Sequence, residues 1–133
     1  MTVNGLDHIN IQATDVAATA QFFADVLGLR AGASAGGSDR AKLTWMFDAA
    51  DRALVHIATP ETLSVIGHTV SGGRGSGSLH HVAFDCSGHD AMTARLEAMG
   101  LGYRSNAVPA VGLRQLFVAE PNGILLELNF HGE

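Results

Sequence analysis

The stretch LDHINIQ at residues 6–12 returns three more times along the chain in altered form. The returns are LVHIA at residues 54–58, LHHVA at 79–83 and LLELN at 125–129. Each is a short apolar run with alternating residue types, which is typical of a β-strand whose neighbouring side chains point to opposite faces. One face of the predicted strands is an apolar core. The other face carries one potential metal ligand per copy: His8, His56, His81 and Glu127.

The four copies belong to an internal repeat. In each half a first strand is followed by a predicted helix, at residues 16–27 and 90–99, and then by further strands. Equivalent landmarks lie at nearly constant offsets: 73 residues from His8 to His81, 72 from Gly28 to Gly100, and 71 from His56 to Glu127. Offsets this similar indicate a duplicated unit. We therefore predict an α+β fold built from two βαβββ modules.

A glycine- and serine-rich segment separates the two modules. Its sequence, GHTVSGGRGSGS at residues 67–78, has no apolar core of its own and predicts a flexible linker. The expected organisation is a single domain over residues 1–133. It comprises module one at 1–66, the linker at 67–78 and module two at 79–133.

Both helices carry sequence signals at their ends. Thr14 and Asp15 are N-cap candidates for the first helix, and Gly28 is placed to end it. Ser87, with Asp90 three residues on, resembles a capping box for the second helix. These signals support a helix that lies on the sheet in each module.

Composition excludes several classes of protein. A hydrophobic content of 47% with 16% charged residues is that of a folded chain. The net charge of -5 and the scattered basic residues argue against a nucleic-acid partner. No apolar run approaches the ~18 to 20 residues of a membrane-spanning helix, and the first predicted strand leaves no room for a signal peptide. Cys86 is the only cysteine, so we expect a cytoplasmic protein without an internal disulfide.

The ligand-bearing face predicts a metal site. Three imidazoles and one carboxylate suit a divalent ion of Fe, Zn, Ni, Co or Mn. Taken alone, either His8 or His81 would more readily be a histidine at the edge of a core. Glu127 lies between two leucines, where an unpaired carboxylate is costly to bury. We therefore predict one divalent metal ion bound by His8, His56, His81 and Glu127.

Four further residues are candidates for substrate binding. Asn10 and Asn129 share the predicted ligand face and could hydrogen-bond a substrate or a metal ligand. Trp45 either packs within the sheet or forms a wall of the substrate site. Arg114, on a strand whose first-half equivalent borders the site, is a candidate anion contact for a substrate carboxylate.

Four stretches resemble the vicinal oxygen chelate superfamily: LDHINI at 6–11, FFADVLGL at 22–29, LHHVAF at 79–84 and FVAEPNGILLEL at 117–128. That superfamily groups glyoxalase I, extradiol dioxygenases, methylmalonyl-CoA epimerase, fosfomycin-resistance transferases and bleomycin-binding proteins. The resemblance implies paired βαβββ modules in an open eight-stranded cup and a divalent metal that chelates adjacent substrate oxygens. His8, His81 and Glu127 match the commonest ligand positions.

His56 departs from part of this family pattern. Glyoxalase I carries a carboxylate at the equivalent position and the epimerase usually carries glutamine. Extradiol dioxygenases and fosfomycin-resistance transferases leave that position without a ligand. The resemblance thus leaves two roles open for His56, a fourth metal ligand or a catalytic acid/base beside the metal.

The expected function is that of a divalent-metal-dependent enzyme acting on a small molecule. Extradiol-dioxygenase-like chemistry is slightly favoured, although the chain lacks the additional modules of many extradiol enzymes. One alternative is a glyoxalase or epimerase type of lyase or isomerase acting through a metal-bound enolate. Another is a non-catalytic binder like the bleomycin-resistance proteins, against which an aromatic content of only 6% argues. We expect a homodimer, with modules paired within one chain or swapped between two.

Overall fold

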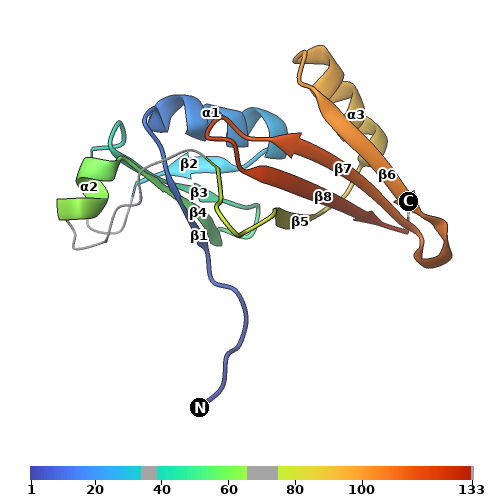
Figure 1. The fold of residues 1–133 in the computed structure, drawn as a ribbon, viewed down its shortest axis with the longest axis horizontal. Helices are drawn as coiled ribbons and strands as arrows, with labels where there is room; N and C mark the ends of the chain where they lie inside the picture. Colours follow the sequence, from blue (N-terminus) through green and yellow to red (C-terminus); the bar gives the residue numbers. More distant parts are fainter. Residues whose placement is uncertain (34–38, 66–74, 133) are drawn as a thin grey trace. The chain divides into compact units, whose positions relative to one another are not determined.

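The computed structural model describes residues 1–33, 39–65 and 75–132. They divide into two compact units, Met1–Gly72 and Gly73–Glu133. Each unit contains a four-stranded sheet with its own helices (Figure 1). The predicted α+β fold with two βαβββ modules is confirmed. Most of the predicted linker, residues 67–74, lies outside the described residues.

The first unit forms one mixed sheet. Its elements are β1 (Ile9–Gln12), α1 (Val16–Leu27), β2 (Arg30–Gly32), β3 (Leu43–Phe47), β4 (Ala53–Ala58) and α2 (Pro60–Val65). The strand order is β1-β4-β3-β2, with β1 parallel to β4 and the other neighbours antiparallel. Helix α1 packs against β2, β3 and β4 and buries Phe23 and Val26 completely. Helix α2 is absent from the sequence-based prediction, and it begins at Pro60 because proline suits a first helical turn.

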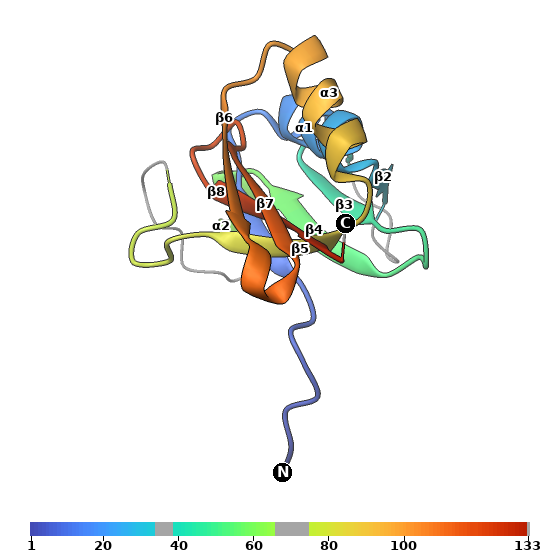
Figure 2. The ribbon, with the colours of Figure 1, turned by 90° about the vertical axis from the view of Figure 1, so that its right-hand side faces the viewer.

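The second unit repeats this arrangement. Its elements are β5 (Val82–Cys86), α3 (His89–Ala98), β6 (Tyr103–Val108), the 3-10 turn η1 (Pro109–Val111), β7 (Leu113–Ala119) and β8 (Leu125–His131). The strand order is β5-β8-β7-β6, with β5 parallel to β8. Helix α3 packs against β7 on one side of the sheet (Figure 2). None of the helices formed by the described residues is long and apolar enough to cross a membrane.

The helix ends agree with the sequence in one module and differ in the other. The Asp15 carboxylate accepts a hydrogen bond of 2.8 Å from the Ala18 N–H, and Gly28 ends α1 with a φ of 69°. The predicted capping box at Ser87 is wrong. Helix α3 starts at His89, so its N-cap is Gly88, which adopts a φ of 84° and offers no side chain.

The two faces of each sheet differ in chemistry, as alternation predicts. In the first unit the face toward α1 is apolar, and Ile11, Val55 and Ile57 on it are at most 1% exposed. In the second unit Leu126, Leu128 and Phe130 are fully buried on the equivalent face. The potential ligands lie on the opposite faces, because they occupy the intervening positions of the same strands.

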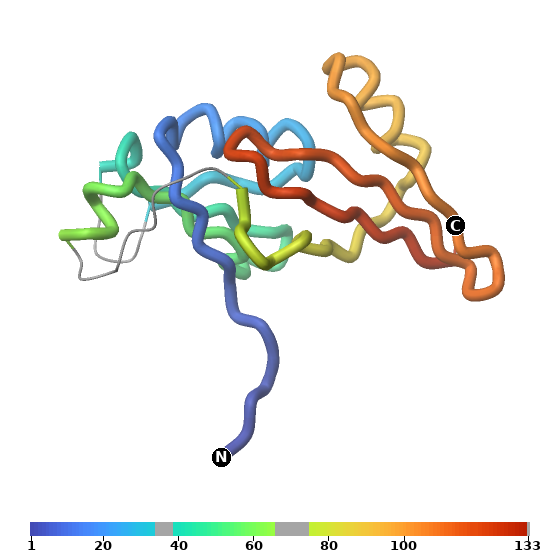
Figure 3. The backbone as a smooth tube through the Cα atoms, in the orientation of Figure 1, coloured from blue at the N-terminus to red at the C-terminus, as the bar shows by residue number. Residues whose placement is uncertain are grey.

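Two predicted strands begin later than the sequence suggests. Residues before β1 extend away from the first sheet (Figure 3), and Leu6 is 83% exposed. The parallel register pairs Ile9 with Val55, so Leu6 lies level with residue 52, before the start of β4. Leu79 is 55% exposed for the same reason, since β8 starts only at Leu125. His8 and His81 thus each lie one residue before a strand.

Cys86 gives a test of the helix-side core of the second unit. Burial raises the pKa of its thiol to about 11, helped by the negative charge of Asp85 and opposed by the Asn129 N–H. At a pH below its pKa, a thiol whose pKa is higher by about two has a thiolate fraction about 100-fold smaller. We therefore expect native Cys86 to react with Ellman's reagent about 100-fold more slowly at pH 8 than the urea-unfolded chain does. Equal rates would contradict the burial.

Candidate metal centre

Strand register gathers four sequence-predicted residues on one face of the first sheet. Asn10 on β1 and Trp45 on β3 both lie directly opposite His56 on β4. His8, two residues before Asn10, lies on the same face. Its ring lies 4.8 Å from that of Trp45 and 6.3 Å from that of His56, centroid to centroid. His8, Asn10 and His56 thus share a face, as alternation predicts, and Trp45 lies on the same face.

His56 is tightly held in this cluster. The Asn10 Nδ2 group donates a hydrogen bond of 2.5 Å to His56 Nδ1. The imidazole also stacks on Trp45, with centroids 4.4 Å apart and rings inclined by only 8°. A neutral imidazole has one lone-pair nitrogen, so this bond leaves the proton on Nε2. In this arrangement His56 presents an N–H donor, which suits an acid/base better than a metal ligand.

His8 has the opposite arrangement. Its Nδ1 lies 2.6 Å from an Asp7 carboxylate oxygen, and the side chain of His8 is about one-third exposed. A carboxylate at this nitrogen holds the proton on Nδ1 and leaves the Nε2 lone pair for a ligand. His8 therefore has the carboxylate-assisted geometry that metal-binding histidines commonly show.

The second unit brings His81 and Glu127 together. Their Nε2 and Oε2 atoms are 3.1 Å apart, and the Glu127 side chain is 12% exposed. The other carboxylate oxygen of Glu127 accepts a hydrogen bond of 2.8 Å from Gln115 Nε2. Gln115 also donates to Asn129 Oδ1 at 3.0 Å. The predicted ligand pair and Asn129 thus share one polar network.

Gln115 and Asn106 are residues of this network that the sequence prediction missed. Asn106 Nδ2 donates a hydrogen bond of 2.7 Å to Gln115 Oε1, which fixes the orientation of the Gln115 amide. Gln115 is 9% exposed and lies directly opposite Asn129. Alternation along β7 offered the signal, since Gln115 is two residues from Phe117, the residue opposite Glu127.

Arg114, the predicted anion contact, lies on the other face of the same strand. Its neighbour Gln115 points toward Glu127, so Arg114 points toward α3. There its guanidinium lies 2.9 Å from an oxygen of Asp90. The pKa of the Asp90 carboxyl is lowered by its hydrogen bonds to His89 and Arg114. The structure therefore does not bring Arg114 together with Glu127.

The donors fit a divalent ion. Two atoms bound at about 2.1 Å to one ion, at roughly 90° to each other, are about 3.0 Å apart. The 3.1 Å between His81 Nε2 and Glu127 Oε2 matches that separation. His81 Nδ1 lies 2.9 Å from His80 Nδ1, an acceptor for its proton when Nε2 binds a metal. Among the described residues, no three His, Cys, Asp or Glu side chains come together, and His81 with Glu127 forms a pair of donors.

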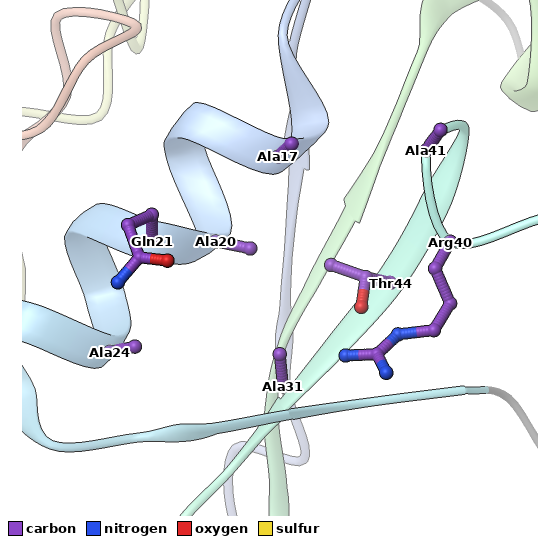
Figure 4. Close-up of a pocket in the computed structure, with 8 residues that line it drawn as sticks. All are labelled: Ala17, Ala20, Gln21, Ala24, Ala31, Arg40, Ala41 and Thr44. Atoms are coloured by element: carbon purple, nitrogen blue, oxygen red, sulfur yellow. The ribbon is translucent and has the colours of Figure 1, made fainter.

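A cavity in the first unit lies away from these residues. It has a volume of about 440 Å³ and lies between α1 and the β2–β3 side of the sheet (Figure 4). Its lining is mostly alanine: Ala17, Ala20, Gln21, Ala24, Ala31, Arg40, Ala41 and Thr44. Thr44 neighbours Trp45 on β3, so this cavity opens on the face opposite His56.

Comparison with known proteins supports the same fold. A family model described as Glyoxalase/Bleomycin resistance protein/Dioxygenase superfamily matches residues 5–128 of the chain. Comparison with curated proteins gives no match.

Several solved structures are similar over nearly the whole chain. Lactoylglutathione lyase from Agrobacterium tumefaciens is 19% identical, with a TM-score of 0.72 and coverage of 98% of this chain and 96% of that one. A virulence protein from Salmonella typhimurium is 15% identical, with a TM-score of 0.75 and coverage of 98% and 99%. A mutant of the fosfomycin resistance protein FosX from Listeria monocytogenes, complexed with Mn(II) and 1S,2S-dihydroxypropylphosphonic acid, is 18% identical, with a TM-score of 0.69 and coverage of 98% and 94%. At these identities the likeness is one of fold.

Proposed function

The chain belongs to the Glyoxalase/Bleomycin resistance protein/Dioxygenase superfamily, and from this premise we propose that it is a metal-dependent enzyme acting on a small molecule. We assign one divalent ion per chain to His8, His81 and Glu127. Two neighbouring oxygens of the substrate complete the coordination. Fe, Zn, Ni, Co and Mn are the candidate ions, and the FosX complex with Mn(II) offers a precedent within the same fold.

The observation that carries the proposal is the Glu127 carboxylate. It is largely buried, one oxygen faces His81 at 3.1 Å and the other is held by Gln115. Burying a carboxylate costs free energy unless a cation and hydrogen bonds compensate, and a metal ion supplies the cation. Because His8 belongs to the other unit, the proposal requires the units to pair, within one chain or between swapped chains.

His56 acts in this proposal as the catalytic acid/base. The bound ion supplies a Lewis acid and a template for the substrate oxygens. The Asn10 amide holds His56 Nδ1, so that Nε2 is the atom that gives or takes a proton. Trp45 covers one face of the imidazole and excludes water from it. Three protein ligands then leave coordination positions open for the substrate.

Two reaction types remain candidates, each with its own support. In the extradiol-dioxygenase pattern three protein residues bind the metal and the position of His56 carries no ligand. Our assignment matches this pattern, and we favour this reaction type. The buried His56 N–H favours the second type, an isomerase or lyase that moves a proton next to the chelated oxygens. Oxygen uptake by the Fe(II)-loaded protein with a panel of catechols tests the first type. Deuterium exchange from D2O into α-hydroxy ketones tests the second.

Elemental analysis tests the metal itself. Protein purified without a metal-affinity tag is expected to contain one divalent ion per chain. A metal-free protein that also binds no added Mn2+, Zn2+ or Fe2+ would overturn the enzyme proposal. It would favour instead a non-catalytic small-molecule binder.

Gln115→Ala is expected to weaken metal binding about 10- to 100-fold, the usual effect of removing a residue that orients a metal ligand. The reason is that Glu127 loses its amide donor and is free to rotate away from His81. Isothermal titration with Zn2+ measures the change. Gln21→Ala is the matched control, because Gln21 is exposed on α1 and donates to Asp25 instead. Equal affinities for both variants would contradict this role of Gln115.

We also propose that the protein is a homodimer. Both β1 and β5 are edge strands of their sheets, and a lone sheet edge readily accepts a partner. Sedimentation equilibrium at micromolar concentration is expected to give twice the chain mass of 13.9 kDa. A species at the chain mass would refute the dimer and leave a metal site within one chain intact.

A further inference from the structure

One row of side chains crosses the second sheet from β8 to β6. Phe117 on β7 lies directly opposite Glu127, and Arg104 on β6 lies directly opposite Phe117. Opposed residues of antiparallel strands share a face, so Arg104 is on the face that carries Glu127. The guanidinium carbon of Arg104 lies 4.1 Å from the centroid of the Phe117 ring. This cation–π contact holds the guanidinium of Arg104 over the Phe117 ring.

Arg104 has different surroundings from three other arginines of the chain. Arg30, Arg52 and Arg114 each have an aspartate oxygen within 2.9 Å. No carboxylate in the part of the chain that the structure describes makes an ion pair with Arg104, which is exposed. Its guanidinium carries five N–H donors in a planar fork that fits a carboxylate. An arginine fixed by a ring rather than by an acid keeps these donors for an anion from solution.

The first unit shows that the fold does not require this cation. There Trp45 lies opposite His56 and Gly32 lies opposite Trp45, so Gly32 is the counterpart of Arg104. A residue needed to hold the sheet together would be expected in both halves of a duplicated fold. On the same face of the first unit, Arg30 lies over the Phe47 ring at 4.9 Å, but that arginine is paired with Asp51.

We infer that Arg104 binds a carboxylate of the substrate, and this rests on the proposed metal site at Glu127. Neighbouring strands are about 4.8 Å apart, so a guanidinium above Phe117 lies roughly one strand from Glu127. A single aromatic ring spans such a distance between two chelating oxygens and a carboxylate. The substrate class is therefore a small molecule with vicinal oxygens and an anionic group on its far side. Arg104 would set specificity, and the metal would hold the reacting end.

The experiment compares two probes, 3,4-dihydroxybenzoate and catechol, which differ only in the carboxylate. Isothermal titration measures both on the Mn2+-loaded wild type, Arg104→Gln and Arg114→Gln. A charge-assisted hydrogen bond at an exposed site is expected to make wild type prefer dihydroxybenzoate about 10-fold beyond the preference of Arg104→Gln. Arg114→Gln is the matched variant on the opposite face, and it is expected to keep the wild-type ratio.

The outcomes separate the inference from the metal proposal. Mn2+ is titrated first, and its affinity is expected to be the same in wild type and Arg104→Gln. If Mn2+ binds and Arg104→Gln keeps the wild-type ratio of the two dissociation constants, Arg104 is not the anion contact. If Arg114→Gln removes the preference instead, the contact belongs to Arg114 and the inference is overturned. If wild type does not bind Mn2+, the metal proposal fails and the inference fails with it.

Discussion

Glu127→Gln and His8→Ala are each expected to lower affinity for the divalent ion by more than about 100-fold, beyond the effect of changing a residue that only orients a ligand. Glu127→Gln keeps the size of the side chain but removes the anionic donor that faces His81. His8→Ala removes the imidazole whose Nδ1 is held by Asp7. Metal content by elemental analysis, combined with Zn2+ titration of the stripped protein, measures both losses.

Two substitutions of the same chemistry serve as controls. Asp25→Asn also turns an acid into an amide, on the exposed side of α1, and His131→Ala removes an exposed histidine near the end of β8. Both are expected to retain one ion per chain. Full metal stoichiometry in Glu127→Gln and in His8→Ala would show that the ligand assignment is wrong.

The sequence was sufficient for the parts of the fold that depend on periodicity. Alternation in the four repeated stretches predicted which side of each strand is buried, and Ile57 and Leu128 are fully buried as expected. Asp15 and Gly28 predicted both ends of α1, because capping depends on a few neighbouring residues. The constant repeat offset predicted that the second half copies the first.

The pairing of β7 with β8 determines which of two polar neighbours faces Glu127. Whether Arg114 or Gln115 points toward Glu127 depends on how β7 pairs with β8, and one residue of shift exchanges the two faces. Both residues are polar, so their own chemistry does not indicate which of them faces Glu127. The ion pair between Arg114 and Asp90 is likewise a tertiary contact that links a helix to a strand. The N-cap at Gly88 was missed because Ser87 offered a competing cap one residue earlier.

Comparison of the two units shows how a duplicated sheet acquires different chemistry at equivalent positions. The first unit has Asn10, His56 and Trp45 side by side across three strands. The equivalent row of the second unit has Ala83, Glu127 and Phe117. One row therefore carries an imidazole stacked on an aromatic ring, and the other carries a carboxylate next to an aromatic ring. Equivalent positions of the duplicated sheet thus differ in the polar group that they present.

Leu128→Ala is expected to lower the free energy of unfolding by about 2–5 kcal/mol, the range for removing a buried leucine side chain. Leu128 is fully buried and lies directly opposite Phe84 on β5 and Leu116 on β7, so its loss leaves a cavity between α3 and the centre of the sheet. Urea unfolding measures the change. Leu79→Ala is the matched control, because Leu79 is 55% exposed and its truncation should change stability by no more than about 0.5 kcal/mol. Equal stabilities of the two variants would contradict the assignment of Leu128 to the core.

Since Leu128 follows Glu127 but faces the other way, folded Leu128→Ala should still bind the metal, whereas Glu127→Gln should lose the metal and keep its stability.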